Sequence, residues 1–124
     1  MVKLKKIFTA AILFLCLFDY RVRGLSDFMT EFENVEYTYG RFLIDEKSYS
    51  ETVVINKGAD YESVLMILKV NVVKEERVGG MRICFGYVNG LDGLYFFEGR
   101  FINIQIVDNG SCILVGSPYI AGGF

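Results

Sequence analysis

The chain has 124 residues, a length that fits one domain, with 13 basic and 15 acidic residues and a formal net charge of −2. It contains no histidine, which excludes the usual Ser-His-Asp and Cys-His catalytic sites and zinc sites built from histidine. With only three cysteines, the chain cannot form a four-thiolate zinc site either.

The N-terminus carries the pattern of a secretory signal peptide. Three lysines within the first six residues precede an uninterrupted apolar run over residues 7–18, which matches the basic and apolar regions of such a signal. The run is short for a membrane span, which needs about 20 residues. Val22 and Gly24 are small enough to precede a cleavage site, so we expect a signal peptide over 1–24 and a single domain over 25–124.

A retained signal anchor is the alternative interpretation of this segment. Lipidation at Cys16 is disfavoured, because Leu15 is bulky where that signal requires a small residue. Removal of residues 1–24 leaves 8 of the 13 basic and 14 of the 15 acidic residues, a net charge of −6. Such a domain repels phosphate groups, so we expect neither nucleic acid nor an anionic membrane as a partner.

Two cysteines remain after this removal, Cys84 and Cys112. Since an exported chain meets an oxidising compartment, we expect a disulfide between them. By reducing the conformational entropy of the unfolded chain, this disulfide would contribute roughly 3–4 kcal/mol to the stability of the fold. The alternative is two buried free thiols that behave as small apolar side chains, and the lack of a C-x-x-C spacing disfavours a redox pair.

The rest of the sequence predicts an all-β fold, a small antiparallel sandwich or flattened barrel of six or seven strands. Alternating or branched apolar residues bounded by glycine and asparagine indicate strands. The segments of this kind are 40–44, 52–56, 63–73, 81–88, 101–107 and 112–115. One short helix is expected over 26–34, with Ser26 or Asp27 as its N-cap and with Phe28, Met29 and Phe32 facing inward.

Two Asn-Gly pairs, Asn89-Gly90 and Asn109-Gly110, lie between predicted strands. Such a pair is the strongest short signal for a hairpin, because both central residues of a type I′ turn take positive φ. We therefore expect a two-residue turn at each pair, and a third, looser reversal at residues 98–100.

The turn at 109–110 predicts the register of the last two strands. A two-residue loop would pair Ile106 with Ile113 and Val107 with Cys112. The core face would then carry Ile104, Ile106, Ile113 and Val115. Asn103, Gln105 and both cysteine sulfurs would point away from this core, and a slip by one residue would bury the two amides.

Few residues are candidates for a functional site. The carboxylate pairs at 45–46 and 75–76 are adjacent in sequence and point apart, so neither suits acid–base catalysis, and we expect no enzyme and no cofactor. Asn109-Gly110-Ser111 is the chain's only N-x-S/T triplet, which makes Asn109 a candidate glycan acceptor.

Eight aromatic residues could line a pocket or a surface patch, although core packing is expected for most of them. Adjacent Phe96 and Phe97 cannot both face inward in a regular strand, so one of them covers a second sheet, a partner or a ligand. We expect contacts to a ligand or partner from Tyr87, Tyr95, Phe96 and Phe97. The eight residues are Tyr37, Tyr39, Phe42, Tyr49, Tyr61, Tyr95, Phe96 and Phe97.

The layout over 64–107 resembles the small secreted insect proteins grouped with multiprotein bridging factor 2. The matching pieces are an aliphatic segment at 65–73, Gly79-Gly80, a short strand at 81–85, a glycine-rich turn at 86–90 and the aliphatic strand 101–107. The chain departs from the family at Gly86-Tyr87, where a second glycine pair is usual, and after Asp108. The resemblance implies a secreted, non-enzymatic protein.

These features together favour a secreted binding module with a protein partner, engaged through exposed aromatic residues and strand edges. The alternative is a carrier that encloses a small apolar ligand in a cavity lined by Phe and Tyr. A third class, a hydrolase that uses carboxylates alone, would require two carboxylates about 5–10 Å apart in a cleft.

Overall fold

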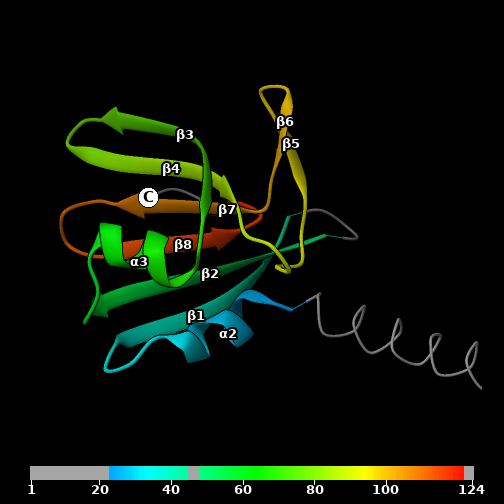
Figure 1. Ribbon diagram of the computed structural model, residues 1–124. Coiled ribbons are helices and arrows are strands. Elements are labelled where there is room, and N and C mark those ends of the chain that lie inside the picture. The colour runs from blue at the N-terminus through cyan, green and yellow to red at the C-terminus, as the bar shows by residue number, and fades with distance from the viewer. Residues whose placement is uncertain (1–22, 45–47, 122–124) are drawn as a thin grey trace, which may run out of the picture.

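The structure, a computed structural model, describes residues 23–44 and 48–121. Six strands form one antiparallel sheet in the order β1-β2-β8-β7-β4-β3, and β5 and β6 form a separate hairpin (Figure 1). The strands are β1 (Glu36–Leu43), β2 (Tyr49–Lys57), β3 (Asn71–Val78), β4 (Met81–Tyr87), β5 (Tyr95–Phe97), β6 (Arg100–Ile102), β7 (Ile104–Asp108) and β8 (Ile113–Ser117).

The predicted all-β antiparallel fold is confirmed. The described residues contain eight strands rather than six or seven, because the aromatic hairpin adds two. The large sheet has two edges, β1 and β3. Since a barrel has no edges, the arrangement is consistent with the predicted sandwich and not with a closed barrel.

The predicted N-terminal helix is present, with a different cap. It consists of α2 (Leu25–Phe28) and the 3₁₀ turn η1 (Met29–Glu31). Gly24 occupies the N-cap position, and its N–H donates to the Asp27 carboxylate at 3.2 Å. The three side chains expected to face inward, Phe28, Met29 and Phe32, are buried.

The prediction of a strand over 63–73 is wrong for its first half, which forms the helix α3 (Tyr61–Ile67). Asp60 caps this helix: its carboxylate accepts from the Ser63 N–H at 2.8 Å, and the Ser63 hydroxyl accepts from the Asp60 N–H at 3.0 Å. This reciprocal pair fixes a helix start. The buried residues Tyr61, Val64 and Leu68 follow helical spacing.

The main core lies between the sheet and the two helices, which cover the same face (Figure 1). Apolar side chains of β2, β4, β7 and β8 meet those of α2, η1 and α3 there. The sheet contributes Val53, Ile55, Cys84, Ile104, Ile106, Ile113 and Val115.

The opposite face of the sheet has a smaller core around Ile83, Val107 and Ile120. The chain after β8 turns back over this face. It passes so close to Gly116 that a Cβ there would lie 2.5 Å from the Ile120 nitrogen. Because this segment covers it, Gln105 is buried, contrary to the sequence prediction, and its Oε1 accepts from the Ile120 N–H at 2.9 Å.

The segment 101–107 is not one strand, because it is interrupted at Asn103. This residue is fully buried rather than solvent-facing. Its Oδ1 accepts from the Val88 N–H at 2.7 Å, and its Nδ2 donates to the carbonyls of Val88 at 2.8 Å and Leu91 at 3.1 Å. The Asn103 side chain therefore supplies the hydrogen bonds that the backbone lacks where the chain leaves the sheet after β4.

The Asn89-Gly90 pair lies in this same loop and does not form the predicted hairpin. The Leu91 N–H donates to the Val88 carbonyl at 3.3 Å, which closes a tight turn. Only Gly90 takes positive φ, +84°, so the turn is not of type I′. β4 pairs with β7 rather than with the segment that follows the turn.

The β7–β8 hairpin has the predicted core face but a different register. Ile106 pairs with Val115 and Asp108 with Ile113, so the loop spans residues 109–112. The predicted pairing differs from this by two residues. Since side chains alternate with period two, a shift of two leaves Ile104, Ile106, Ile113 and Val115 on the same face.

Removal of the Asn103 side chain is expected to destabilise the domain. Asn103→Ala leaves the Val88 N–H and the Leu91 carbonyl without their partner in a buried site and removes one of the two donors to the Val88 carbonyl, which costs about 2–4 kcal/mol. Urea unfolding measures this loss. Asn71→Ala, at an exposed position in β3, is the control and is expected to change the free energy of unfolding by less than about 0.5 kcal/mol. Equal effects of the two substitutions would contradict a structural role for the buried amide.

Candidate functional site

The β5–β6 hairpin projects from the sheet and carries three of the four aromatic residues expected to contact a ligand or partner (Figure 1). Phe97 pairs with Arg100, so the loop contains only Glu98 and Gly99. Both take positive φ, +47° and +82°, as a type I′ turn requires. The reversal expected here is confirmed, and it is tight rather than loose.

Aromatic contacts anchor the base of the hairpin. The Phe97 ring stacks on Phe85 of β4, with centroids 4.5 Å apart and planes inclined by 20°. Tyr95 meets Tyr119 edge to face at 4.9 Å. Of the adjacent pair in β5, Phe97 therefore covers the sheet and Phe96 faces away from it.

An ion-pair network fixes the turn end of the hairpin. The Lys74 ammonium lies 2.8 Å from the Glu76 carboxylate and 2.7 Å from that of Glu98. Hydrogen bonds to these two carboxylates raise the pKa of Lys74. All three groups are solvent-accessible, so the network helps to position the hairpin but contributes little to the free energy of unfolding.

The other side of the hairpin presents an aromatic pair to solvent. The Phe96 and Phe101 rings lie edge to face, with centroids 5.0 Å apart. Phe96 is 60% exposed and Phe101 is 55% exposed, and the neighbouring Leu94 is exposed as well. We call Leu94, Phe96 and Phe101 the exposed aromatic patch.

A shallow pocket of about 220 Å³ lies between the hairpin and the C-terminal segment. Aromatic rings form most of its wall, and Gln105 contributes an amide to it. The lining residues are Phe85, Tyr95, Phe97, Ile102, Gln105, Tyr119 and Ile120.

The structure thus brings together three of the four predicted contact residues, Tyr95, Phe96 and Phe97. Tyr87 is exposed at the end of β4, and no ring contact joins it to the hairpin in the described residues. Phe101 was not among the predicted contact residues, although a two-residue loop at Glu98-Gly99 places it opposite Phe96. Phe85 and Tyr119 join through tertiary packing, for which there was no local signal.

The expectation of core packing for most of the eight aromatic residues is wrong. Six of them are exposed, because the edge strand β1 has little packed against it and the hairpin projects from the sheet. Tyr61 is buried and Phe97 is half-buried. The exposed residues are Tyr37, Tyr39, Phe42, Tyr49, Tyr95 and Phe96.

The paired carboxylates at 75–76 point apart, as expected. Glu75 accepts from the Tyr61 hydroxyl at 2.9 Å on the helix side of the sheet, whereas Glu76 pairs with Lys74. Burial and the hydrogen bond to Glu75 raise the pKa of the Tyr61 hydroxyl. The carboxylate pair at 45–46 lies outside the described residues. Within the described residues, no group of three or more acidic or cysteine side chains is arranged to hold a metal ion.

The predicted disulfide is not formed: Cys84 and Cys112 are both free. The sequence placed both sulfurs away from the core, but Cys84 belongs to the main core, opposite Ile106. The sheet has a core on each face, so both sides of β4 are covered. The side that carries Cys84, which looked the less apolar in sequence, faces the main core. Cys112 lies in the loop beyond the end of β7, outside the strand pairing.

The side chain of Asn109 organises the loop between β7 and β8. Its Oδ1 accepts from the N–H groups of Ser111 at 2.9 Å and Cys112 at 3.0 Å. Gly110 takes positive φ, +88°, but Asn109 does not, so the predicted type I′ turn is wrong. The triplet 109–111 lies at an exposed loop tip, and glycan attachment stays a prediction.

Comparison with known proteins gives no relative. No protein-family model, no curated protein and no solved structure matches the chain. The resemblance to the multiprotein bridging factor 2 group therefore stays a prediction. In residues 23–44 and 48–121, no helix has the length and apolar character needed to cross a membrane.

Thiol labelling tests the state of the cysteines. Burial raises the pKa of the Cys84 thiol to about 11, so at pH 8 only about one molecule in a thousand carries the reactive thiolate there. We expect one reactive thiol per domain, Cys112, in the native protein at pH 8 and a second only after unfolding in denaturant. No labelling even after unfolding would establish the disulfide instead.

Two substitutions separate the roles of Asn109. Asn109→Gln and Ser111→Ala both destroy the glycan acceptor, so each removes any attached glycan from the intact mass. Only Asn109→Gln displaces the oxygen that accepts two backbone hydrogen bonds, at a cost of about 1 kcal/mol. We expect a lower melting temperature for Asn109→Gln alone in unglycosylated protein. Identical melting curves would show that the amide does not organise the loop.

Proposed function

We propose that the protein is a secreted, non-enzymatic binding module that engages a protein partner through the exposed aromatic patch. The observation that carries the proposal is the pairing of two largely solvent-exposed phenylalanine rings, Phe96 and Phe101, on a projecting hairpin. The signal-like N-terminal pattern supports secretion, and residues 1–22 lie outside the described part of the chain.

The patch has the physical properties of a protein-binding hot spot. Aromatic side chains bury 150–250 Å² each and dominate interface energies. The type I′ turn and the stacking of Phe97 on Phe85 hold the hairpin in place. Binding therefore requires little additional ordering, which lowers its entropic cost.

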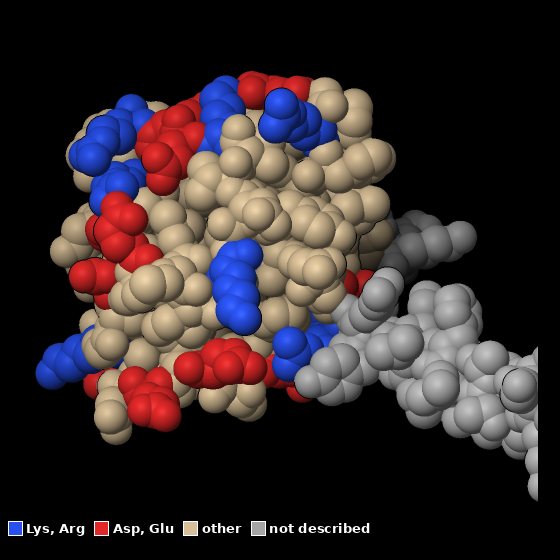
Figure 2. All heavy atoms as spheres, viewed as in Figure 1, with Lys and Arg blue, Asp and Glu red and all other residues tan. Residues whose placement is uncertain are grey.

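The surroundings of the patch indicate the chemistry of the partner. Charged side chains lie at the turn end of the hairpin, including Lys74, Glu98 and Arg100, while Figure 2 shows a mostly uncharged surface below them. An apolar centre with a charged rim is the usual anatomy of a protein interface. The complementary surface is an apolar groove with a polar margin.

The alternative, a carrier that encloses a small apolar ligand, has less support. The pocket beside the hairpin holds about 220 Å³, below the roughly 300–1,000 Å³ of most ligand sites. It is also shallow, whereas a carrier cavity covers most of its ligand. A partner that covers the patch from outside fits these dimensions better.

Site-specific photocrosslinking tests the proposal. Phe96→p-benzoylphenylalanine is expected to give one protein adduct in fluid from the natural source. Excess unlabelled protein should abolish the adduct, because the site is saturable. Introduction of Phe101→Ala into the same chain should reduce the affinity at least tenfold, since truncation removes half of the ring pair.

Met66→p-benzoylphenylalanine is the matched control, because Met66 is the most exposed large apolar residue on α3, away from the hairpin. It is expected to give no saturable adduct. The proposal fails if position 96 forms no protein adduct, if its adduct is a small molecule, or if both positions crosslink alike.

A further inference from the structure

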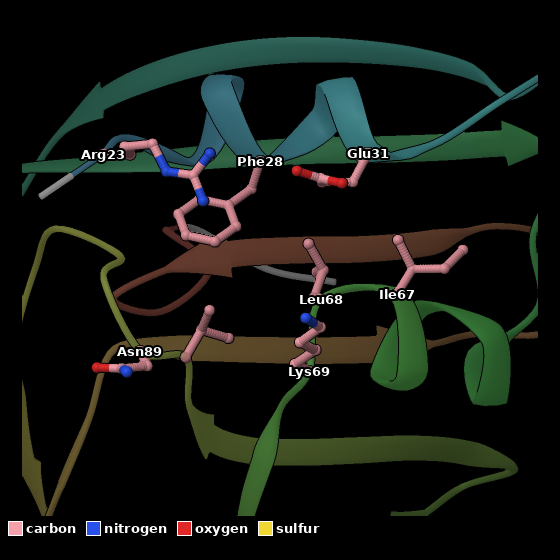
Figure 3. A pocket seen from close by; sticks show the side chains of 8 residues that line it. Arg23, Phe28, Glu31, Ile67, Leu68, Lys69 and Asn89 are labelled. Atoms are coloured by element: carbon pink, nitrogen blue, oxygen red, sulfur yellow. The ribbon is translucent and has the colours of Figure 1, made fainter. Parts of the chain in front are cut away.

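A second recess, separate from the aromatic hairpin, lies between α2 and the end of α3 on the helix-covered face. It holds about 300 Å³. Figure 3 shows Arg23, Phe28 and Glu31 on one side of it, and Leu68, Lys69 and Asn89 on the other. We call this recess the interhelical cleft. None of the residues singled out as contacts from the sequence lies in it.

The floor of the cleft is apolar and its rim is polar. Phe28, Leu68 and Val88 are almost fully buried and form the floor. The rim carries two cations, Arg23 and Lys69, and one carboxylate, Glu31. A few polar groups around an apolar recess are typical of small-molecule sites.

Lys69 occupies a backbone conformation that is unfavourable for its type. It follows the last turn of α3 with φ of +54°, in the left-handed position where helices usually end in glycine. The Val70 N–H donates to the Leu65 carbonyl at 3.0 Å and closes this helix end. A glycine would form the same motif without the clash of a Cβ. The fold thus keeps a cation where the backbone alone favours glycine, and Figure 3 shows its side chain pointing toward α2.

Arg23 is held at the opposite side of the cleft. Its N–H donates to the Gly90 carbonyl at 2.8 Å, and its carbonyl accepts from the Asp92 N–H at 2.7 Å. Its guanidinium lies over the Phe28 ring, 4.3 Å from the centroid. Both cations therefore start from fixed backbone positions, from which each can donate charge-assisted hydrogen bonds to an anionic group in the cleft.

We propose that the interhelical cleft binds a compact amphiphile with an apolar body and one anionic group. The apolar body lies on Phe28, Leu68 and Val88, and the anionic group accepts hydrogen bonds from Arg23 and Lys69. The cleft volume is at the lower end of the range for ligand sites, which limits the occupant to a short aliphatic or single-ring carboxylate. The cleft and the aromatic patch involve different residues, so this inference is independent of the proposed function.

Three ligands of equal chain length test the charge requirement by calorimetry: octanoate, octanol and octylamine. Octanoate is expected to bind saturably and most tightly, and octylamine most weakly. Arg23→Gln should reduce the affinity for octanoate about tenfold, because one charge-assisted hydrogen bond is lost, and should leave the affinity for octanol unchanged. Arg77→Gln, in the exposed strand β3, is the control and should change neither affinity.

Lys69→Gly separates a binding role from a structural one. It removes the cation and also the unfavourable left-handed conformation of a residue with a Cβ. We expect octanoate affinity to fall about tenfold while the melting temperature stays the same or rises. A fall in melting temperature with unchanged affinity would assign Lys69 a purely structural role and overturn the proposal.

The inference requires that the mature protein retain Arg23, although the predicted cleavage after Gly24 would remove it. Binding is measured on protein whose N-terminus precedes Arg23, and N-terminal sequencing of the natural protein checks this requirement. Because the Arg23 backbone bonds to Gly90 and Asp92, the inference requires a start at or before Arg23, which replaces the start at Leu25 expected from the sequence. The proposal is overturned if the natural protein starts at Leu25, if octylamine binds as tightly as octanoate, or if octanoate does not saturate below millimolar concentration.

Discussion

The carboxamide of Asn103 is the interaction on which the rest of the structure depends. It is fully buried and bonds to the main chain of Val88 and Leu91. These bonds let the chain leave the sheet after β4 and return to it as β7, with the hairpin in between. Without a partner for these backbone groups, the excursion would bury unsatisfied donors and acceptors, which is costly. The projecting hairpin therefore exists because one side chain completes the backbone pairing.

The same loop also shapes the interhelical cleft. The Gly90 carbonyl accepts from Arg23, while Asn103 holds Val88 and Leu91. Val88 and Asn89 then line the cleft on the side toward α3. Hydrogen bonds within one loop thus connect the two proposed binding surfaces, which lie on different parts of the molecule. Each of these surfaces has a non-glycine residue at positive φ, Glu98 at the hairpin turn and Lys69 at the cleft.

The two edges of the sheet differ in how exposed backbone is protected. β3 carries Lys74, Glu75, Glu76 and Arg77 in succession, and charge of this kind prevents pairing with another chain. β1 instead presents aromatic residues, with few side chains packed against it. The sequence pattern predicted strands over 40–44 and 63–73, which overlap the end of β1 and the start of β3. Their positions at opposite edges depend on α3, which carries the chain from β2 to β3 and lies where the sequence pattern predicts a strand.

Turn signals predicted where the chain reverses better than how it does so. The type I′ turn occurs at Glu98-Gly99 and not at the two Asn-Gly pairs, because the Asn109 side chain binds the following N–H groups and widens its loop to residues 109–112. A side chain that can bond to nearby backbone offers it an alternative to the hairpin ladder. The pairing therefore shifted by two residues from the expected register, while the inward face stayed the same.

By itself, the sequence determined the all-β class, the inward face of the β7–β8 hairpin, the N-terminal helix and the exclusion of histidine chemistry. These follow from local composition and from a period-two pattern that a shift of two residues leaves unchanged. Only the tertiary structure decided the register, the burial of Asn103, the free state of Cys84 and Cys112, and the placement of Arg23 and Lys69 around one cleft. Each of these depends on contacts between segments far apart in the chain, which no local pattern encodes.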